Sequence, residues 1–558
     1  MLGFRRRKRL SAEIAPDEIF LDSSNLPQFN VDSLEGRIER PIGRQALFIT
    51  AIAVGLLMIV YTGRAVDLQF INGAAYAKQA AENQLSEGVL FADRGIIADR
   101  KGRDLAYNTR ESADDDFAGR AYADYRGLAH VVGYTKAPAK DSAGFYFRMS
   151  YEGIDGIERA LNGVLAGHNG TTLTETDAKG ALVSQSIKVE PVPGARVSLS
   201  LDAEVTQGLY DAIANVADQS GFQGGSGVIM DVRTGELLAM TSYPEYSMQA
   251  LSRGDQASLA ALNADKRQPF LNRAVNGLYA PGSIVKPFMG VAALEEGIID
   301  EHKEILSTGS ISIPNPYNPD LPSVFKDWRV NGLTDVRRAI AVSSDIYFYE
   351  VGGGYKDQPG LGIDRIDKYL RIFGFGAPTG IEGFKEPAGN IPTPAWKEAT
   401  FDGDPWRLGD TYHTAIGQYG TQVTPLQAVR AVAALANDGA LLTPTLLMGT
   451  TPEKTLLGLP LHPLEVAREG MRMGVTDGIA TAVNVPYVAV AAKTGTAQIG
   501  VKNEFLNSWM VGFFPYEHPR FAYAIVLERG PAGTLIGASA ATRAFLDWMH
   551  ANAPEYLN

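Results

Sequence analysis

The chain has 558 residues, of which 45% are hydrophobic and 20% are charged, so it can bury a core and is not disordered as a whole. Its formal net charge is −12 and no long basic stretch follows the first ten residues, which argues against nucleic acid as a partner. Because the chain has no cysteine, disulfides, thiolate catalysis and cysteine-ligated metals are excluded.

The first predicted element is a membrane span over residues 45–63, an uncharged apolar run between Arg44 and Arg64. Nineteen helical residues rise about 28 Å, close to the roughly 30 Å hydrocarbon core of a bilayer. Apolar residues lie on all sides of this helix, which argues against a buried core helix with one apolar stripe. A leader of 44 residues is too long for a cleaved signal peptide.

Positive charge predicts the orientation of the span, because lysine and arginine are retained in the cytoplasm. The basic residues before it are Arg5, Arg6, Arg7, Lys8, Arg9, Arg37, Arg40 and Arg44. Residues 1–44 are therefore expected to be a cytoplasmic tail of a single-pass protein in the cytoplasmic membrane, with the rest of the chain outside.

The region after the span is predicted to form a separate domain over residues 64–198. A helix is expected over 65–90, followed by turns and short strands from 91 and again over 150–190. Pro191, Pro193 and Gly194 then precede an alternating strand, which places a domain boundary near 195–200.

The second domain is predicted over residues 199–558. An amphipathic helix over 203–219 is followed by a hairpin over 227–242, and helical patterns fill much of 285–440. Strand-like runs return at the end of the chain, at 488–500, 507–515 and 521–530, before a last helix over 541–553. Strands at both ends with helices between them indicate one sheet built from distant parts of the chain.

Ser283 and Lys286 form the first candidate catalytic motif, in the segment YAPGSIVKPF. Pro281 and Gly282 predict a turn that leads into an apolar helix, and residues three apart share one helix face. The Lys286 amine can then reach the Ser283 hydroxyl, which needs a neighbouring base to become a nucleophile. Lysine acts as that base only if burial or another cation lowers its pKa.

A second Ser-x-x-Lys, at Ser323 and Lys326, is a weak rival because it follows a proline-rich loop and no helical apolar run comes after it. Nothing in this segment predicts that the two side chains share a face. Ser323 is therefore not expected to be the nucleophile.

Lys493, Thr494, Gly495 and Thr496 end a strand-like run. On an edge strand the lysine and threonine side chains can line a cleft, and glycine allows close approach of a ligand backbone. The Lys493 cation is expected to hold a substrate carboxylate and to lower the pKa of Lys286.

Ser343, Ser344 and Asp345 lie 60 residues after the predicted nucleophile. A hydroxyl and a carboxylate on a loop between helices can relay a proton. By itself such a triplet is more typical of a turn or a helix cap.

The three motifs together, in this order, resemble the signature of penicillin-binding proteins and class A β-lactamases. Class B penicillin-binding proteins have a transpeptidase domain that is similar to the segments SSDIYFY, AIGQYGTQVTPLQ and KTGTAQ. Their pedestal is similar to the segments RGIIADRKGRDLA and GIDGIERALNG. Within the class, the chain is most similar to the penicillin-binding protein 2 group, the elongation enzymes. The resemblance implies an α+β or α/β fold: an N-terminal transmembrane helix, an elongated β-rich pedestal, and a transpeptidase domain with a five-stranded antiparallel sheet covered by helices on both faces plus an all-helical subdomain.

The resemblance also implies a mechanism. Ser283 would attack the penultimate carbonyl of a stem peptide that ends in D-Ala-D-Ala, after Lys286 removes its proton, and Ser343 with Asp345 would pass a proton to the leaving D-Ala. Lys493 and Thr494, with Gly495 and Thr496, would hold the terminal carboxylate, and the N–H groups of Ser283 and Thr496 would form the oxyanion hole. An amine from a second stem would complete the cross-link, β-lactams would acylate Ser283, and a RodA-type membrane glycosyltransferase would be the partner.

The chain departs from the family in two places. Only 21 residues separate Asn108 from His130, where the family carries a larger head, so a short head is expected. Some members bind a metal through histidine and cysteine ahead of the second motif. This chain has Asp327 and Asn331 there but no cysteine, and neither a metal nor a cofactor is expected.

Two rival functions remain open at this point. One is a D,D-carboxypeptidase or β-lactamase on the same fold, in which water resolves the acyl-enzyme. The other is non-enzymatic, a penicillin sensor or a scaffold. The pedestal and the anchor favour a transpeptidase, and the 44-residue tail is too short for a sensor's effector domain.

Overall fold

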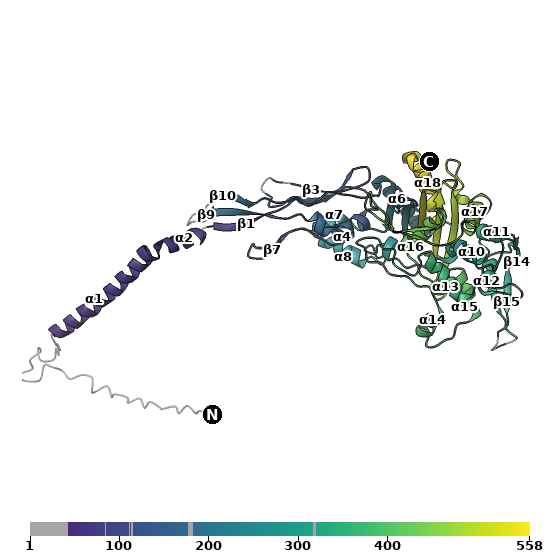
Figure 1. Ribbon diagram of the computed structural model, residues 1–558, viewed down its shortest axis with the longest axis horizontal. Helices are drawn as coiled ribbons and strands as arrows, with labels where there is room; N and C mark the ends of the chain where they lie inside the picture. The colour runs from purple at the N-terminus through teal and green to yellow at the C-terminus, as the bar shows by residue number, and fades with distance from the viewer. Residues whose placement is uncertain are drawn as a thin grey trace, which may run out of the picture. The chain divides into compact units, whose positions relative to one another are not determined.

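The computed structural model describes residues 43–83, 85–110, 112, 115–176, 182–315, 318 and 320–558. The chain divides into two compact units (Figure 1). The first comprises residues 1–86 with 176–181, and the second comprises residues 87–175 with 182–558. Residues 1–42 of the predicted cytoplasmic tail lie outside the described residues.

The first unit contains a long apolar helix. Helix α1 (Arg44–Val66) continues through the π-helical segment η4 (Asp67–Ile71), and α2 (Gly73–Asn83) follows. Arg44–Ile71 is long and apolar enough to cross a membrane, and no side chain of α1 is buried. The helix predicted over 65–90 ends early, because Leu85–Leu90 form strand β1 and pair with β9.

The N-terminal part of the second unit is rich in short strands. A three-stranded sheet has the order β1-β9-β10, with β9 at Gly170–Thr176 and β10 at Leu182–Val189. A four-stranded sheet has the order β11-β2-β3-β4. Its strands are β2 (Ile97–Ala98), β3 (Asp104–Thr109), β4 (Gly119–Tyr122) and β11 (Val197–Ser198).

A buried ion triad ties this β-rich part together. Glu158 lies between two guanidinium groups, with Oε2 2.6 Å from Arg94 Nε and Oε1 2.7 Å from Arg120 Nε. All three side chains are buried, so the carboxylate depends on these two cations for compensation of its lost hydration.

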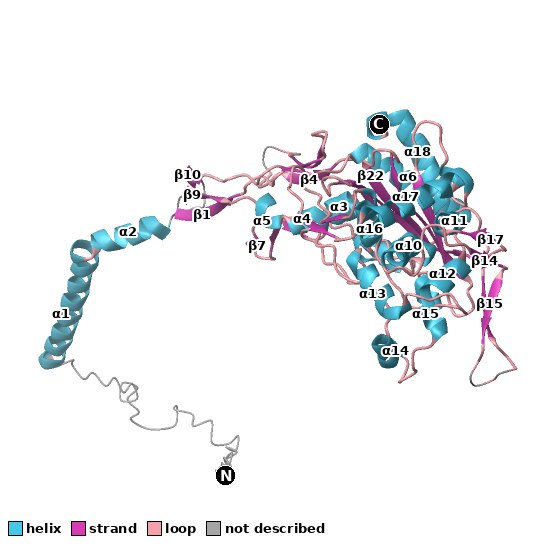
Figure 2. Ribbon diagram, turned by 45° about the vertical axis from the view of Figure 1, so that its right-hand side comes forward, coloured by secondary structure: helices cyan, strands magenta, loops and turns pink. Residues whose placement is uncertain are grey.

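The C-terminal part is built on the five-stranded antiparallel sheet that the family resemblance implied. The order is β13-β12-β22-β21-β20. The strands are β12 (Gly224–Asp231), β13 (Leu237–Tyr243), β20 (Ala491–Ile499), β21 (Phe505–Phe514) and β22 (Phe521–Pro531). The β12–β13 hairpin therefore joins three strands from the end of the chain, as predicted, and β20 lies at one edge. Figure 2 shows the strands of this part in magenta, among the cyan helices.

Helices cover both faces of this sheet because its strands alternate between two hydrophobic cores. Val228 and Val526 belong to one core, and their neighbours Ile229 and Ile525 belong to the other. Helices α6 (Ala203–Ser220) and α18 (Ala538–Asn552) pack on the second face. Helix α16 (Pro425–Ala436) packs on the first, with Leu426, Val429 and Val432 among its buried residues.

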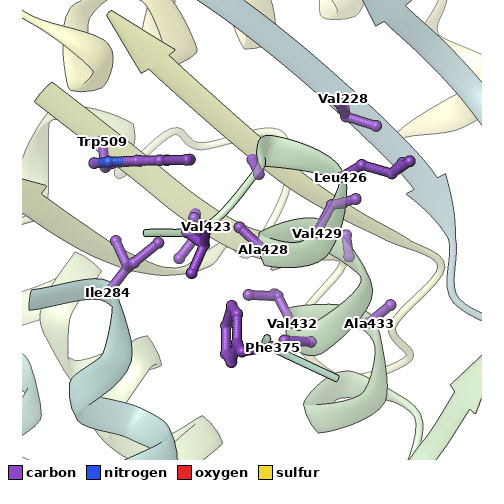
Figure 3. Close-up of a cluster of buried hydrophobic side chains, with 14 of the residues drawn as sticks. Val228, Ile284, Phe375, Val423, Leu426, Ala428, Val429, Val432, Ala433 and Trp509 are labelled. Carbon is purple, nitrogen blue, oxygen red and sulfur yellow. The ribbon is translucent and has the colours of Figure 1, made fainter. Parts of the chain in front are cut away.

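The core beneath α16 continues to the turn that carries Ser283 (Figure 3). Ile284, Val423 and Trp509 extend the apolar cluster that α16 forms with the sheet. The residue after the predicted nucleophile is thus anchored in the main core of the domain.

A helical lobe lies beside the sheet. Its helices are α10 (Lys286–Glu295), α11 (Val336–Val342), α12 (Asp345–Gly353), α13 (Gly362–Ile372), α14 (Pro394–Thr400), α15 (Leu408–Ala415) and α17 (Leu461–Asp477). The lobe also carries two short ribbons, β14 (Ile305–Ser307) with β17 (Gly332–Thr334) and β15 (Ser310–Ile313) with β16 (Ser323–Lys326).

Candidate active site

Ser283 lies on a 3₁₀ turn, η5 (Gly282–Val285), that runs directly into α10 at Lys286. A 3₁₀ helix has three residues per turn, so residues i and i+3 lie in line. Gly282 has φ +56°, a left-handed conformation that suits glycine. The sequence therefore forms a turn that presents the serine hydroxyl and the lysine amine on one side.

Three segments hold this turn in place. The Gly282 N–H donates to the Gly417 carbonyl at 2.9 Å, and Trp509 Nε1 donates to the Ala280 carbonyl at 3.0 Å. A Cβ on Gly417 would lie 2.2 Å from the Gly282 oxygen, and one on Gly495 would lie 2.7 Å from Ile284. Both glycines are therefore required by close packing around the turn.

The Lys286 amine is fully buried and donates three hydrogen bonds. Its acceptors are the Ser343 carbonyl at 2.8 Å, Ser343 Oγ at 3.2 Å and Asp345 Oδ1 at 2.6 Å. Within the described part of the chain, no hydrogen bond joins this amine to Ser283 Oγ. The structure thus brings Lys286 to the second motif and leaves the Ser283 hydroxyl open to the cleft.

Ser343 lies between the two lysines of the motifs. Its Oγ accepts from Lys493 Nζ at 2.9 Å as well as from Lys286. Ser343 has φ +58°, a conformation that is uncommon for a residue with a side chain, at the junction of α11 and α12. This strained junction places one hydroxyl within reach of both amines.

Lys493 has a lowered pKa. Complete burial and the nearby Lys286 cation lower the pKa of Lys493 well below its usual value, against the smaller opposing effect of Asp345. Lys286 forms an ion pair with the Asp345 carboxylate, and its role as the base stays a prediction.

Asp327 is a residue of this site that motif reasoning considered only as a metal ligand. Its carboxylate accepts from Ser344 Oγ at 2.8 Å, from Asp345 N at 3.1 Å and from Ile346 N at 3.3 Å. Ser307 Oγ, Asn331 Nδ2 and Trp328 N also donate to it. Burial opposes ionisation, but these bonds, the one from Asp345 N foremost, lower the pKa of Asp327. Asp327 therefore holds the start of α12 in place.

A cavity of about 1020 Å³ joins the predicted residues. Ser283, Ser343 and Asp345 line it, together with Thr494 and Thr496 from the edge strand β20. The other lining residues include Lys326, Asp327, Trp328, Tyr349, His413, Ile416, Gln418, Tyr419 and Gln498. Within the described ranges, no group of three or more histidine and carboxylate side chains is arranged to hold a metal ion.

Some of these lining residues were missed by motif reasoning. Gln418 Nε2 donates to the Thr496 carbonyl at 3.5 Å. Neither Gln418 nor His413 belongs to one of the three motifs. The segment AIGQYGTQVTPLQ had marked this region as similar to the family, but it did not show that its start faces the cleft. That placement depends on the packing of α15 against α12.

The rival serine lies in a different setting. Ser323 and Lys326 belong to strand β16, where residues three apart point to opposite faces. Ser323 is also absent from the residues that line the cavity. At the Ser283 turn, in contrast, the serine and the lysine three residues later lie on the same side.

The fold and the cleft define the class of serine acyl-transfer enzymes in which a Ser-x-x-Lys turn faces the edge strand of an antiparallel sheet. Comparison with known proteins gives the family. Residues 225–550 match the penicillin binding protein transpeptidase domain, and residues 116–199 match the penicillin-binding protein dimerisation domain. The chain belongs to the penicillin-binding protein transpeptidase family.

Curated relatives and solved structures agree with this assignment. The chain is 32% identical to peptidoglycan D,D-transpeptidase MrdA of Escherichia coli over 451 residues, 74% of this chain and 68% of that protein. It is similar to penicillin-binding protein 2 of Helicobacter pylori in complex with MreC, with a TM-score of 0.70 at 26% identity, covering 84% of this chain and 99% of that one. A chain from a peptidoglycan synthase complex has a TM-score of 0.71 at 26% identity, covering 90% and 98%.

Proposed function

We propose that this protein is a serine-type peptidoglycan D,D-transpeptidase that cross-links stem peptides during cell-wall elongation. The observation that carries the proposal is the convergence of two buried amines on Ser343, in the cavity that also contains Ser283 and the β20 edge. The family, and relatives named as D,D-transpeptidases, support the reaction class.

The proton path follows from the charge states. Lys286 is ion-paired with Asp345, so it must lose a proton before it can act as a base. Ser343 can pass that proton to Lys493, whose lowered pKa favours the neutral amine. Lys286 then takes the proton of the Ser283 hydroxyl, and the serine attacks the penultimate carbonyl of the donor. The bond to the terminal D-Ala breaks, and the proton on Lys286 passes through Ser343 to the leaving nitrogen.

The substrate would be held along the edge strand. Once protonated, Lys493 carries the positive charge that the terminal carboxylate of the donor requires, and the Thr494 and Thr496 hydroxyls face the same cavity. Gly495 allows the turn of Ser283 to approach β20 closely. The N–H groups of Ser283 and Thr496 would bind the oxyanion, a contribution of about 3 kcal/mol per donor.

Labelling with a fluorescent penicillin tests the nucleophile. Wild-type protein should form a covalent adduct that survives denaturing electrophoresis, and Ser283→Ala should abolish it. Ser323→Ala is the matched control and should label like the wild type. Labelling that persists in Ser283→Ala, or that is lost in Ser323→Ala, would refute the assignment.

Three further parts of the proposal concern the chain outside the cleft. The apolar helix Arg44–Ile71 would anchor the protein in the cytoplasmic membrane, with the transpeptidase domain (residues 199–558) outside. The pedestal (residues 64–198) and the span would bind a RodA-type glycosyltransferase. A variant whose pedestal is truncated at residue 195 tests this contact. Full glycan polymerisation by the glycosyltransferase with that variant would refute it.

A further inference from the structure

A second pocket continues the catalytic cleft at the end of β20. Its volume is about 430 Å³, and it shares Gln418, Tyr419 and Gln498 with the catalytic cavity. Its lining also includes Asn507 of β21 and Arg529 of β22, so we call it the Arg529 pocket. Because the two hollows share three lining residues, a ligand bound in the catalytic cavity can extend into the Arg529 pocket.

Arg529 lies at an irregularity of the sheet. Ser508 of β21 pairs with Leu527 of β22 and Leu506 with Gly530, so two residues of β22 are opposite one residue of β21. Such a β-bulge changes the direction of a side chain and is common next to active sites. Arg529 has φ +52°, a left-handed conformation that is uncommon for a residue with a side chain. The bulge leaves its side chain exposed at the pocket.

Asn507 holds the bulge and keeps one hydrogen-bond donor unused. Its Oδ1 accepts from the Arg529 main-chain N–H at 3.0 Å, which fixes the orientation of the amide. Its Nδ2 has no acceptor among the described residues, although Asn507 is only 4% exposed. A buried donor without an acceptor costs free energy, so this one indicates that a ligand supplies the acceptor.

The Arg529 guanidinium is also without an acceptor. It lies over the Phe505 ring, 5.0 Å from the ring centroid, and forms no ion pair within the described part of the chain. The ring supports one face of the guanidinium while its N–H groups stay available. A guanidinium beside an unused amide donor suits a carboxylate, which can accept from several donors at once.

The carboxylates near Arg529 have other partners. Glu528, which also lines the pocket, accepts from Arg273 Nε at 2.8 Å and from a second nitrogen of that guanidinium at 2.6 Å. Glu504 accepts from the Lys502 main-chain N–H at 2.8 Å. Among the described lining residues Arg529 is the only cation, and the one acidic lining residue is neutralised by Arg273.

The position of the pocket along β20 indicates which part of the substrate it meets. The strand presents Thr494, Thr496 and Gln498 to the catalytic cavity, each about 6.6 Å after the last. In the proposed complex the donor's terminal carboxylate lies at Thr494 and its attacked carbonyl at the Thr496 N–H. The peptide before that carbonyl therefore runs towards Gln498 and the pocket. The acceptor amine replaces the leaving D-Ala and enters at the opposite end, near Thr494.

We propose that Arg529 and Asn507 form a subsite for a carboxylate on the side chain of the donor residue that precedes D-Ala-D-Ala. This inference rests on the transpeptidase function proposed above. The guanidinium and Asn507 Nδ2 donate to the carboxylate and select donors that carry it. Neither group touches the reacting atoms, so both act on the choice of donor.

The test measures D-Ala release from two donor peptides by full-length protein in detergent. The donors are identical except that the side chain before D-Ala-D-Ala ends in a carboxylate in one and in a carboxamide in the other. Release of D-Ala reports acylation whether water or an amine later resolves the acyl-enzyme. Arg529→Gln removes the charge, and Arg529→Asn does so with a residue that tolerates a positive φ. Arg159→Gln, exposed on α4 (Gly156–Ala160), is the matched control variant.

Wild-type protein should use the carboxylate donor at least tenfold better in kcat/KM, the effect of about one hydrogen bond to a charged group. Arg529→Gln and Arg529→Asn should lose this preference by slowing the carboxylate donor alone, with the carboxamide donor changed less than twofold. Labelling by a fluorescent penicillin with an uncharged side chain should also change less than twofold. Arg159→Gln should match the wild type throughout.

Three results would overturn the subsite. The first is equal use of the two donors by the wild type, and the second is a preference that survives in both Arg529 variants. The third is an equal loss of both donors and of labelling in folded Arg529 variants, which would make Arg529 part of the framework of the sheet. Wild-type protein that is not labelled by penicillin and releases no D-Ala would instead refute the proposed function.

Discussion

Replacing Asp327 with alanine would test how the second motif is held in place. The carboxylate accepts from two main-chain N–H groups, of Asp345 and Ile346, and from the Ser344 hydroxyl. Each buried donor left without its acceptor costs about 1 kcal/mol or more, so Asp327→Ala should destabilise the domain by about 3 kcal/mol. In a domain of this size that is a fall in Tm of about 5 °C.

Acylation should suffer as well, because Ser343 keeps its left-handed conformation only while the residues after it are fixed. We expect penicillin labelling of Asp327→Ala to slow more than tenfold. Asp327→Asn retains one acceptor oxygen and should lose about half as much stability. Asp320→Ala, at an exposed position seven residues earlier, is the control and should behave like the wild type.

The pH dependence gives a second readout for Asp327. Its pKa is lowered in the folded protein, so the carboxylate contributes stability above its unfolded pKa of about 3.9, and that stability is lost as the pH falls through the lower folded value. The stability gap between wild type and Asp327→Asn should therefore narrow below about pH 4. Equal Tm and equal labelling rates of Asp327→Ala and wild type at neutral pH would refute the reasoning.

The remaining predictions concern the pedestal, the serine turn and the lysine pair. Glu158→Ala should destabilise the β-rich part of the chain by about 3 kcal/mol, because two buried guanidinium groups lose their carboxylate. Faster limited proteolysis within residues 87–198 would show this loss of stability, and a wild-type digestion pattern would contradict the prediction. Gly417→Ala should slow penicillin labelling at least tenfold with the fold retained by circular dichroism, because its Cβ would meet the Gly282 oxygen at 2.2 Å, and unchanged labelling would argue against this constraint. Because the pKa of Lys493 is lowered, penicillin labelling of the wild type should fall as the pH decreases and Lys493 becomes protonated. Lys493→Arg stays charged and should label slowly at every pH. A wild-type pH profile in Lys493→Arg would exclude Lys493 as the titrating group.

Much of the architecture could be predicted from the chain alone, because it rests on local patterns. The uncharged run at 45–63 predicted the apolar helix, and apolar-rich, strand-like runs predicted the strands that became β12, β13, β20, β21 and β22. The order of the three motifs indicated the family, which the comparisons confirmed. The assignment of roles to Ser283, Lys286 and Lys493 stays a prediction that the labelling experiments decide.

Other features depended on distant contacts that no local pattern records. The helix predicted over 65–90 ends early because Leu85–Leu90 pair with a strand 80 residues later in the chain. Asp327 belongs to no recognisable motif. Its role in the site comes from hydrogen bonds that its carboxylate accepts from residues 17 to 19 positions later in the chain.

The sequence by itself determined which side chains are available for acyl transfer, because residue type and spacing at the Ser283 turn, the Ser343 loop and the Lys493 strand are local properties. Only the tertiary structure decided how charge is shared among them. A pKa depends on burial and on neighbours, and the fold buries Lys493 beside Lys286 while it pairs Lys286 with Asp345. The fold also brings His413, which no motif contains, to the wall of the same cavity.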